Sequence, residues 1–298
     1  MPDALPTPDD VRGYFARNNW GRWGADDQRG AINLITPEKR VAAARLVQSG
    51  RSVSLSRDFP KMPGRGNPMP AQHFMRIFDF GVVDYIGISY HGYVTTHVDA
   101  LCHVWDERGM WGGRDPKQEL STEGTRWGGI EHWRDGITTR GVLLDVPRHR
   151  GTSFVTIDEP VHGDELEAIA RAQGVRIEPG DALCVYSGRE AFQAAHREWS
   201  GYTPPSPGLH VSCMPFVRDH DVAALVWDLM DAAPNDYGLH FSMHGVLWTY
   251  GVALVDNALL QPLAEACAQE GRYEFMLTFA PLPVVGGTGS PVNPIALF

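Results

Sequence analysis

The sequence predicts one domain of the α/β or mixed α+β class, and three observations support this. Short apolar segments typical of buried strands are interleaved with helix-like segments along the whole chain. The 298 residues contain no internal repeat, no low-complexity linker and no abrupt change of composition. Hydrophobic residues make up 43% of the chain, which is enough for one large core. We therefore expect residues 1–298 to form a single domain.

Strands are predicted where β-branched and aliphatic runs are bounded by turn formers. The two runs 182–186 and 222–226 are almost entirely apolar, so we expect them at the centre of the sheet. The segment 57–70 is rich in Pro and Gly and is predicted to be a loop. The remaining strands are expected at 51–56, 78–88, 141–146, 252–255 and 274–280.

Three helices have recognisable ends or spacing. Thr36 is a typical N-cap because Pro37 and an acidic residue follow it in the first turn. Residues 164–173 have helical composition, and residues 240–250 have helical spacing that ends at Gly251. Helices and strands are thus interleaved along the chain.

Charge and composition exclude several classes of function. The net charge is -10, and the basic residues form no run longer than residues 148–150, so neither nucleic acid nor an anionic membrane is an expected partner. The first residues lack the features of a secretion signal, and no apolar run approaches the roughly 18 residues of a membrane span. We expect a cytoplasmic protein. The cysteines are too far apart for a thiolate zinc site; they are Cys102, Cys184, Cys213 and Cys267.

A dense group of polar residues lies between His91 and His103. In an extended strand His91, Tyr93, His97 and Asp99 would point to one side, with His97 and Asp99 adjacent. Imidazole and carboxylate ligands together suit zinc or manganese. If the chain bends after Ala100, His103 lies near the same ion without ligating it and could serve as a general base. The alternative is a polar strand face that is hydrogen-bonded to solvent.

A second group of polar residues lies in the C-terminal third of the chain. His240 and His244 are spaced i, i+4, which on a helix places them on one face at a spacing suited to a metal. Asp256 follows the predicted strand 252–255 and could return to the same ion, or could be only a turn residue. The sequence therefore offers His97, Asp99, His244 and Asp256 as ligands.

At these residues the sequence resembles the cyclase-like metal-dependent hydrolase family, which includes bacterial kynurenine formamidase, isatin hydrolase and a zinc-dependent trans-dienelactone hydrolase. The family signature is His-x-x-x-His-x-Asp-x-Pro-x-His, followed much later by a His and an acidic residue. His97, Asp99 and His103 match its second His, its Asp and its final His, and His244 and Asp256 match the later pair. Further stretches agree at residues 34–38, 140–145, 178–181 and 286–294.

The chain departs from the signature at three positions. Tyr93 stands where the first His belongs, Leu101 where Pro belongs, and Asp256 where the family has Glu. His91 lies two residues before Tyr93 and could supply the missing nitrogen, while Tyr93 could bind the substrate through its phenol. We therefore expect about one zinc or manganese ion per chain, with His91 and His240 as further candidate ligands.

The resemblance implies a central mixed, partly barrel-like sheet flanked by helices, and a homodimer or homotetramer in which residues 1–30 form an N-terminal arm. It implies hydrolysis of an amide, cyclic amide or lactone by metal-activated water, with His103 as the base. The substrate is expected to be a small aromatic or cyclic molecule. Candidate pocket aromatics are Trp20, Trp23, Phe74, Trp105 and Trp127. Two alternatives remain: a metal-dependent cyclase or lyase, and a ligand-binding protein with a degenerate metal site.

Overall fold

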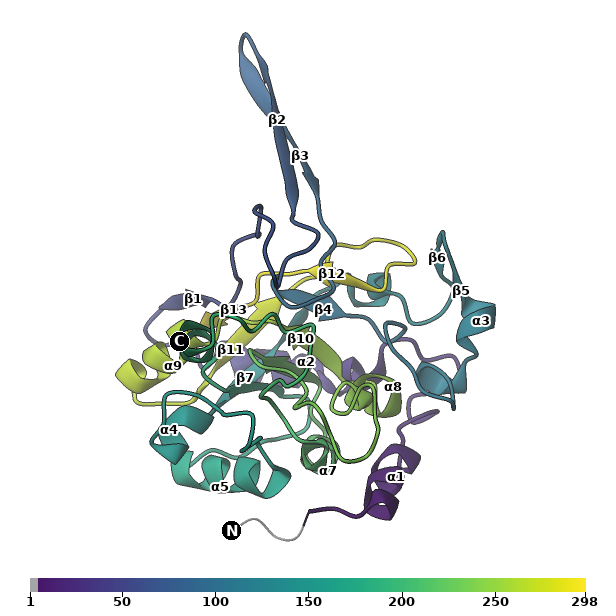
Figure 1. Cartoon of the computed structure of the whole chain (residues 1–298), viewed down its shortest axis with the longest axis vertical. Coiled ribbons are helices and arrows are strands. Elements are labelled where there is room, and N and C mark those ends of the chain that lie inside the picture. The colour runs from purple at the N-terminus through teal and green to yellow at the C-terminus, as the bar shows by residue number, and fades with distance from the viewer. Residues whose placement is uncertain (1–4) are drawn as a thin grey trace.

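The computed structural model describes residues 5–298 and contains one large mixed sheet surrounded by helices (Figure 1). The sheet curls into a half-barrel, as the resemblance implied. Its strands run in the order β1-β13-β11-β7-β8-β9-β10-β4-β12. They are β1 (Ser52–Ser54), β4 (His97–Asp99), β7 (Ile137–Asp145), β8 (Ala182–Tyr186), β9 (Ala224–Trp227), β10 (Ala253–Asp256), β11 (Glu274–Phe279), β12 (Gly289–Pro291) and β13 (Ile295–Leu297).

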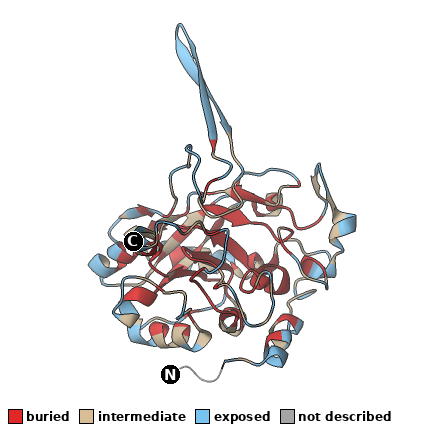
Figure 2. Ribbon diagram, in the orientation of Figure 1, coloured by how far each residue is buried: buried red, intermediate tan, exposed pale blue. Residues whose placement is uncertain are grey.

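The four central strands β7, β8, β9 and β10 are parallel, and antiparallel strands extend the sheet on both sides. All four residues of β9 and of β10 are buried, because both faces of a parallel sheet are covered. The buried centre of the molecule is visible in Figure 2. The two apolar runs predicted as central strands correspond to β8 and β9, so that prediction is confirmed.

The helices lie around this sheet, and α2, α5 and α9 all contact β7. Thr36 caps α2 as predicted, since its hydroxyl accepts a hydrogen bond from the backbone N–H of Lys39 at 3.2 Å. None of the helices in the described part of the chain is long and apolar enough to cross a membrane. Their bounds are α1 (Pro8–Ala16), α2 (Pro37–Ala44), α3 (Pro116–Glu119), α4 (Val146–Arg150), α5 (Gly163–Gln173), α6 (Arg189–Ala195), α7 (Met214–Asp219), α8 (Gly245–Tyr250) and α9 (Gln261–Glu270).

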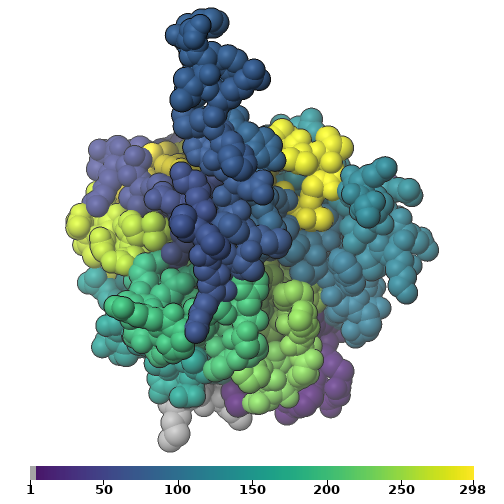
Figure 3. All heavy atoms as spheres, turned by 45° about the horizontal axis from the view of Figure 1, so that its top comes forward, coloured from purple at the N-terminus to yellow at the C-terminus, as the bar shows by residue number. Residues whose placement is uncertain are grey.

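A β-hairpin projects from the body of the molecule (Figures 1 and 3). Its strands are β2 (Gln72–Phe78) and β3 (Gly81–Gly87), so the prediction of one strand over 78–88 was wrong at its start. The chain turns back at residues 79–80 and pairs with a strand that the sequence had not indicated. A second, short hairpin is formed by β5 (Leu120–Ser121) and β6 (Gly124–Thr125).

Both faces of the projecting hairpin carry exposed apolar side chains. Phe80 at its tip is 97% exposed and Ile77 is 81% exposed, which is unusual for large hydrophobic residues. The others are Phe74, Met75, Phe78, Val82, Val83, Tyr85 and Ile86. The expected homodimer or homotetramer stays a prediction. In such an assembly a second subunit could cover the apolar side chains of this hairpin.

The N-terminal segment packs against its own chain. Of the expected arm over residues 1–30, the first four residues lie outside the described part. The indole N–H of Trp20 donates a 2.6 Å hydrogen bond to the carbonyl of Trp248, and the ring of Trp23 lies 6.2 Å from that of Trp111. These two tryptophans therefore help to attach the segment to α8 and its surroundings.

The backbones at Gly30 and Gly251 approach each other closely where the N-terminal segment is attached. Both have positive φ, and a Cβ on Gly30 would lie 2.4 Å from the carbonyl oxygen of Gly251. The next N–H, that of Ala31, donates to this oxygen at 2.7 Å. A side chain at position 30 would push the two backbones apart.

We expect Gly30→Ala to lower the free energy of unfolding by about 3 kcal/mol. The left-handed conformation costs about 1–2 kcal/mol with a side chain, and overpacking adds about 1–3 kcal/mol. Gly151→Ala is the matched control, because Gly151 also has positive φ but has no atom within 4 Å of its ideal Cβ. Urea unfolding of both variants measures the difference; equal losses would show that the contact with Gly251 contributes nothing.

Candidate metal centre

The site is built on the antiparallel pair β4 and β10. In their register His97 lies opposite Asp256, and Asp99 follows His97 by two residues on the same face of β4. All three side chains are almost completely inaccessible, with exposures of 1% for His97, 0% for Asp99 and 3% for Asp256. The Nε2 atom of His97 lies 3.9 Å from Oδ2 of Asp256. Strand pairing thus brings together polar residues that are more than 150 positions apart.

Asp99 lies at the centre of the group. Nδ1 of His91 and Nε2 of His97 lie 3.0 Å and 3.3 Å from its Oδ1, and Nε2 of His103 lies 3.9 Å from its Oδ2. Burial would raise the pKa of Asp99, but the neighbouring imidazoles, led by that of His103, hold it well below its usual range. Neither oxygen has a hydrogen-bond partner of normal geometry among the described residues. Asp99 is therefore a buried carboxylate with free lone pairs.

His91 reaches this group from a loop. Its Nε2 lies 3.0 Å from the hydroxyl of Thr288, and its ring stacks on that of His103 with centroids 3.8 Å apart. Gly289 leaves the necessary room, since a Cβ there would lie 2.9 Å from the His91 ring and 2.6 Å from the carbonyl oxygen of Val98. The glycine-rich C-terminal segment therefore positions His91.

His244 is the residue before α8 and points its ring between two carboxylates. Nε2 lies 3.2 Å from Oδ2 of Asp256, while Nδ1 forms a short contact with Asp231. Burial would lower the pKa of His244, but Asp231 and Asp256 raise it well above its ordinary value. The pKa of Asp231 is in turn lowered to about 2: burial opposes this shift, and His244 is its main cause. The indole N–H of Trp227 donates to the other oxygen of Asp256.

The extended strand expected from His91 to Asp99 was wrong outside β4. Only residues 97–99 pair with β10 and β12, and Gly92 has a φ of 140°. The preceding carbonyls are held by side chains instead of a strand partner: Asn257 donates to Gly92 at 2.6 Å and to Thr95 at 3.1 Å. His91 and Asp99 are near each other because this loop folds back, and not because they share a strand face.

The helix predicted over residues 240–250 begins only at Gly245. The carboxylate of Asp231 accepts hydrogen bonds from the backbone N–H groups of residues 242, 243 and 244, so these form a capped turn instead of another helical turn. His240 and His244 do not share a helix face. His240 is exposed and lies outside the two groups of ligand atoms found among the described residues.

A buried arginine forms hydrogen bonds to residues that adjoin the candidate ligands. The guanidinium of Arg189 donates to the carbonyl of Asp228 at 3.1 Å, to the side-chain oxygen of Asn257 at 2.5 Å and to the carbonyl of Tyr93. Burial lowers its pKa to about 9. Asn257 directly follows Asp256, so Arg189 connects one end of β10 to the loop that leads into β4.

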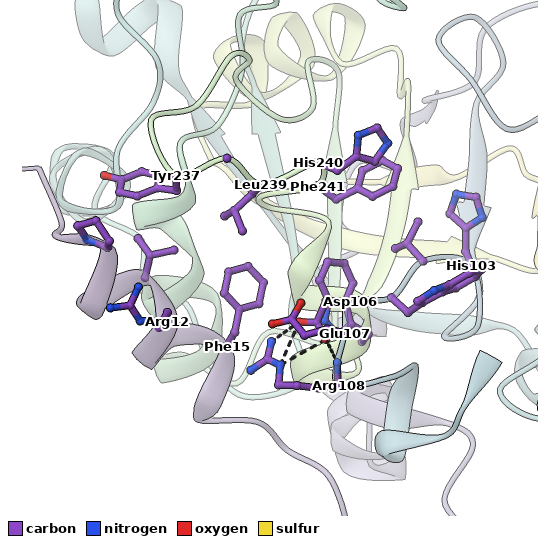
Figure 4. A pocket seen from close by; sticks show the side chains of 16 residues that line it. Arg12, Phe15, His103, Asp106, Glu107, Arg108, Tyr237, Leu239, His240 and Phe241 are labelled. Atoms are coloured by element: carbon purple, nitrogen blue, oxygen red, sulfur yellow. Dashed lines mark hydrogen bonds and ion pairs between the residues drawn. The ribbon is translucent and has the colours of Figure 1, made fainter. Parts of the chain in front are cut away.

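A cavity of about 860 Å³ opens beside His103 (Figure 4). Of the predicted pocket aromatics, Trp105 lines it. Trp20, Trp23 and Trp127 do not, since they pack within the protein, and Phe74 is on the projecting hairpin. The Tyr93 side chain packs against Trp199 and Tyr202, and burial raises the pKa of its phenol.

Three residues of this site were missed in the sequence: Asp231, Arg189 and Thr288. Asp231 had a detectable signal, since it follows the apolar run that became β9, and polar residues at the carboxyl ends of parallel strands commonly form sites. Arg189 and Thr288 carried no such signal, because their contacts join segments about 96 and 197 residues apart.

The chemistry of the donors fits a divalent metal ion. His91, His97 and Asp99 offer ligand atoms within 4.8 Å of one another, and so do Asp99, His244 and Asp256. Asp99 is common to both groups and has two free carboxylate oxygens. Imidazole with carboxylate is the ligand set of zinc and manganese sites. This group could therefore hold a metal ion.

Asp231 fixes the ring of His244, so Asp231→Asn should weaken metal binding about 10- to 100-fold, the usual effect of losing such a supporting carboxylate. Competition with a chelating dye measures the dissociation constant. Asp236→Asn is the control, because Asp236 is exposed and five residues away. An unchanged affinity in Asp231→Asn would show that the His244 ring needs no such support.

Comparison with known proteins agrees with this geometry. The Cyclase family model, described as Putative cyclase, matches residues 51–234. The chain belongs to this family. A crystal structure described as that of a novel cyclase superposes on the cyclase-family chain with a TM-score of 0.81 at 32% identity, covering 94% of this chain and 99% of that one. The resemblance inferred from the signature residues is confirmed.

More distant structures share the fold of this cyclase-family chain. An isatin hydrolase bound to the product analogue thioisatinate has a TM-score of 0.61 at 15% identity, covering 88% of this chain and 99% of that one. Isatin hydrolase A from Ralstonia solanacearum has a TM-score of 0.60 at 16% identity, covering 88% and 97%. A comparison with curated proteins gave no match.

Proposed function

We propose that this protein is a metal-dependent hydrolase that cleaves an amide, cyclic amide or lactone bond. The ion would be held by His97, Asp99, His244 and Asp256, with His91 as a further ligand. The observation that carries the proposal is Asp99, a fully buried carboxylate that is surrounded by imidazoles and has no hydrogen-bond partner of normal geometry among the described residues. Such a group is costly unless a cation completes its environment.

The ligand set indicates zinc or manganese, about one ion per chain. When bound, a divalent ion supplies Lewis-acid chemistry, which makes water more acidic and polarises a carbonyl group.

His103 is the proposed general base. Burial lowers its pKa to about 4, so its imidazole is neutral near pH 7 and can accept a proton. It faces the cavity, and its Nε2 lies 3.9 Å from Oδ2 of Asp99, whose negative charge stabilises the protonated ring. The proton taken from the attacking water is then donated to the leaving nitrogen or oxygen, which restores the neutral imidazole.

The relatives agree with a ring-bearing substrate. Three of the similar structures are isatin hydrolases; one of these is bound to the product analogue thioisatinate and another to benzyl benzoate. Isatin contains a cyclic amide, and its hydrolysis requires water to attack a ring carbonyl. This supports the amide and lactone classes for the present chain, in which Trp105 offers an aromatic surface beside His103.

Metal content tests the proposal. Mass spectrometry on protein purified without a chelator should find about one zinc or manganese ion per chain, and His97→Ala, Asp99→Ala and His244→Ala should each lose it. His240→Ala is the matched control, because this exposed histidine lies outside the cluster and should keep the ion. Metal that is unaffected by the three changes would overturn the proposal.

Turnover in oxygen-18 water then separates hydrolysis from a lyase or cyclase reaction. The panel contains N-formyl aromatic amines, cyclic amides and lactones. Label in the product supports hydrolysis, because the attacking oxygen comes from water. Unlabelled product would indicate a lyase or cyclase, and metal binding without turnover of any compound would favour a ligand-binding protein.

A further inference from the structure

The cavity beside His103 is much larger than the reaction centre requires. Its volume is about 860 Å³, whereas about 150 Å³ is enough to enclose a benzene ring. His103 is at one end, and Arg12 and Tyr237 are at the other (Figure 4). The space therefore has room for at least two linked rings in a substrate whose reacting bond lies at His103.

Helix α1 forms the far wall of this cavity and is firmly attached. Phe15 is 5% exposed and stacks on Trp248 with ring centroids 5.9 Å apart. Gly245, the residue after His244, makes room for the Phe15 ring, since a Cβ there would lie 2.3 Å from it. The hydroxyl of Tyr250 donates to the carbonyl of Tyr14 at 2.8 Å. Helix α1 therefore packs directly on α8, the helix that follows the candidate metal ligand His244.

Apolar groups dominate the middle of the cavity. Val11 and Phe15 from α1 line it together with Leu239 and Phe241, which belong to the segment that leads to His244. The Arg108 guanidinium lies 5.3 Å from the centre of the Phe15 ring. A ligand in this space would be surrounded mostly by carbon atoms.

The two arginines of the cavity each pair with a carboxylate. Arg108 is bound to Asp106, with Nε 3.0 Å from Oδ2, and Arg12 is paired with Asp9 on the surface. Glu107 forms no ion pair with any described residue. Both guanidiniums thus already have a carboxylate beside them, and Glu107 adds a negative charge that would oppose an anionic substrate.

We infer that the cavity selects substrates that carry a neutral, apolar group of two linked or fused rings, and that it discriminates against anionic analogues. The inference rests on the proposed function, because it takes His103 as the place of reaction. Helix α1 is then a specificity element, in which Phe15 and Val11 supply apolar lining away from the reacting bond.

Two fluorescent probes with the same ring skeleton test the charge preference: the neutral N-phenyl-1-naphthylamine and its sulfonate, 8-anilino-1-naphthalenesulfonate. The neutral probe should bind one site per chain at least tenfold more tightly than the sulfonate. Leu239→Lys places an unpaired cation in the cavity, so it should weaken binding of the neutral probe about tenfold and strengthen binding of the sulfonate. Trp105→Lys should likewise weaken binding of the neutral probe and strengthen binding of the sulfonate. Its position is 42% exposed and therefore tolerates a charge.

Phe80→Ser is the control for binding at the apolar hairpin, and it should leave the affinity for the neutral probe unchanged. Equal or tighter binding of the sulfonate to the unaltered protein, or loss of probe binding in Phe80→Ser with retention in both lysine variants, would overturn the inference. The measurement requires neither metal nor turnover. Failure of the proposed hydrolase function would instead appear in the metal content and oxygen-18 experiments.

Discussion

Replacing His103 by glutamine should lower kcat/KM about 10²- to 10⁴-fold on the substrate found in the panel, while the metal content stays that of the unaltered protein. This is the usual contribution of a positioned acid or base. His103 alone among the clustered residues lines the cavity, and its pKa of about 4 keeps the ring neutral. Glutamine has a similar reach but cannot accept the proton. Steady-state kinetics and mass spectrometry on the same preparation give both numbers.

His240→Gln is the control for the kinetic experiment. His240 lines the same cavity, but it is exposed and lies outside the groups of candidate ligands, so its replacement should change kcat/KM by less than about threefold. Retained turnover in His103→Gln would show that another group takes the proton. Loss of metal in this variant would instead make His103 a ligand.

The second large effect is expected for Arg189→Met, which should lower the free energy of unfolding by about 3–5 kcal/mol. Methionine fills a similar space but leaves three buried acceptors without donors, and each such loss costs about 1–3 kcal/mol. These acceptors are the carbonyls of Asp228 and Tyr93 and the side chain of Asn257. Urea unfolding measures the change.

The same variant should also bind metal more weakly, because Arg189 joins Asn257 to the loop before His97. Arg189→Lys should recover part of the stability through one of the three contacts. Arg22→Met is the control: the Arg22–Asp221 pair is on the surface, and such pairs contribute about 0–1 kcal/mol. Equal losses in the Arg189 and Arg22 variants would show that the buried contacts have no special value.

Local sequence was sufficient where the physical cause is local. The apolar runs of β8 and β9 predicted central strands because a strand that is covered on both faces must be apolar throughout. Thr36 predicted the start of α2 because its hydroxyl satisfies an otherwise free N–H group. His97 and Asp99 were placed on one strand face because strand side chains alternate, and β4 confirms this placement.

Predictions failed where a distant group takes over a backbone hydrogen bond. Periodicity suggested a helix through His240, but Asp231 accepts the N–H groups that would have extended it. Alternation suggested a strand through His91, but Asn257 binds the carbonyls that a strand partner would need. Asp231 and Asn257 lie outside the segments whose conformation they change, so the sequence of those segments does not indicate either interaction.

The sequence alone predicted the class of fold and the family, and it selected His97, Asp99, His103, His244 and Asp256 as candidate site residues, because residue types and their spacing can be read locally. Only the tertiary structure decided how they meet. The pairing of β4 with β10 puts Asp256 opposite His97, and the return of the C-terminal segment places Thr288 against His91. Such contacts depend on the order of the strands in the sheet and on packing between distant segments. The local sequence of either segment does not indicate which other segment it will contact.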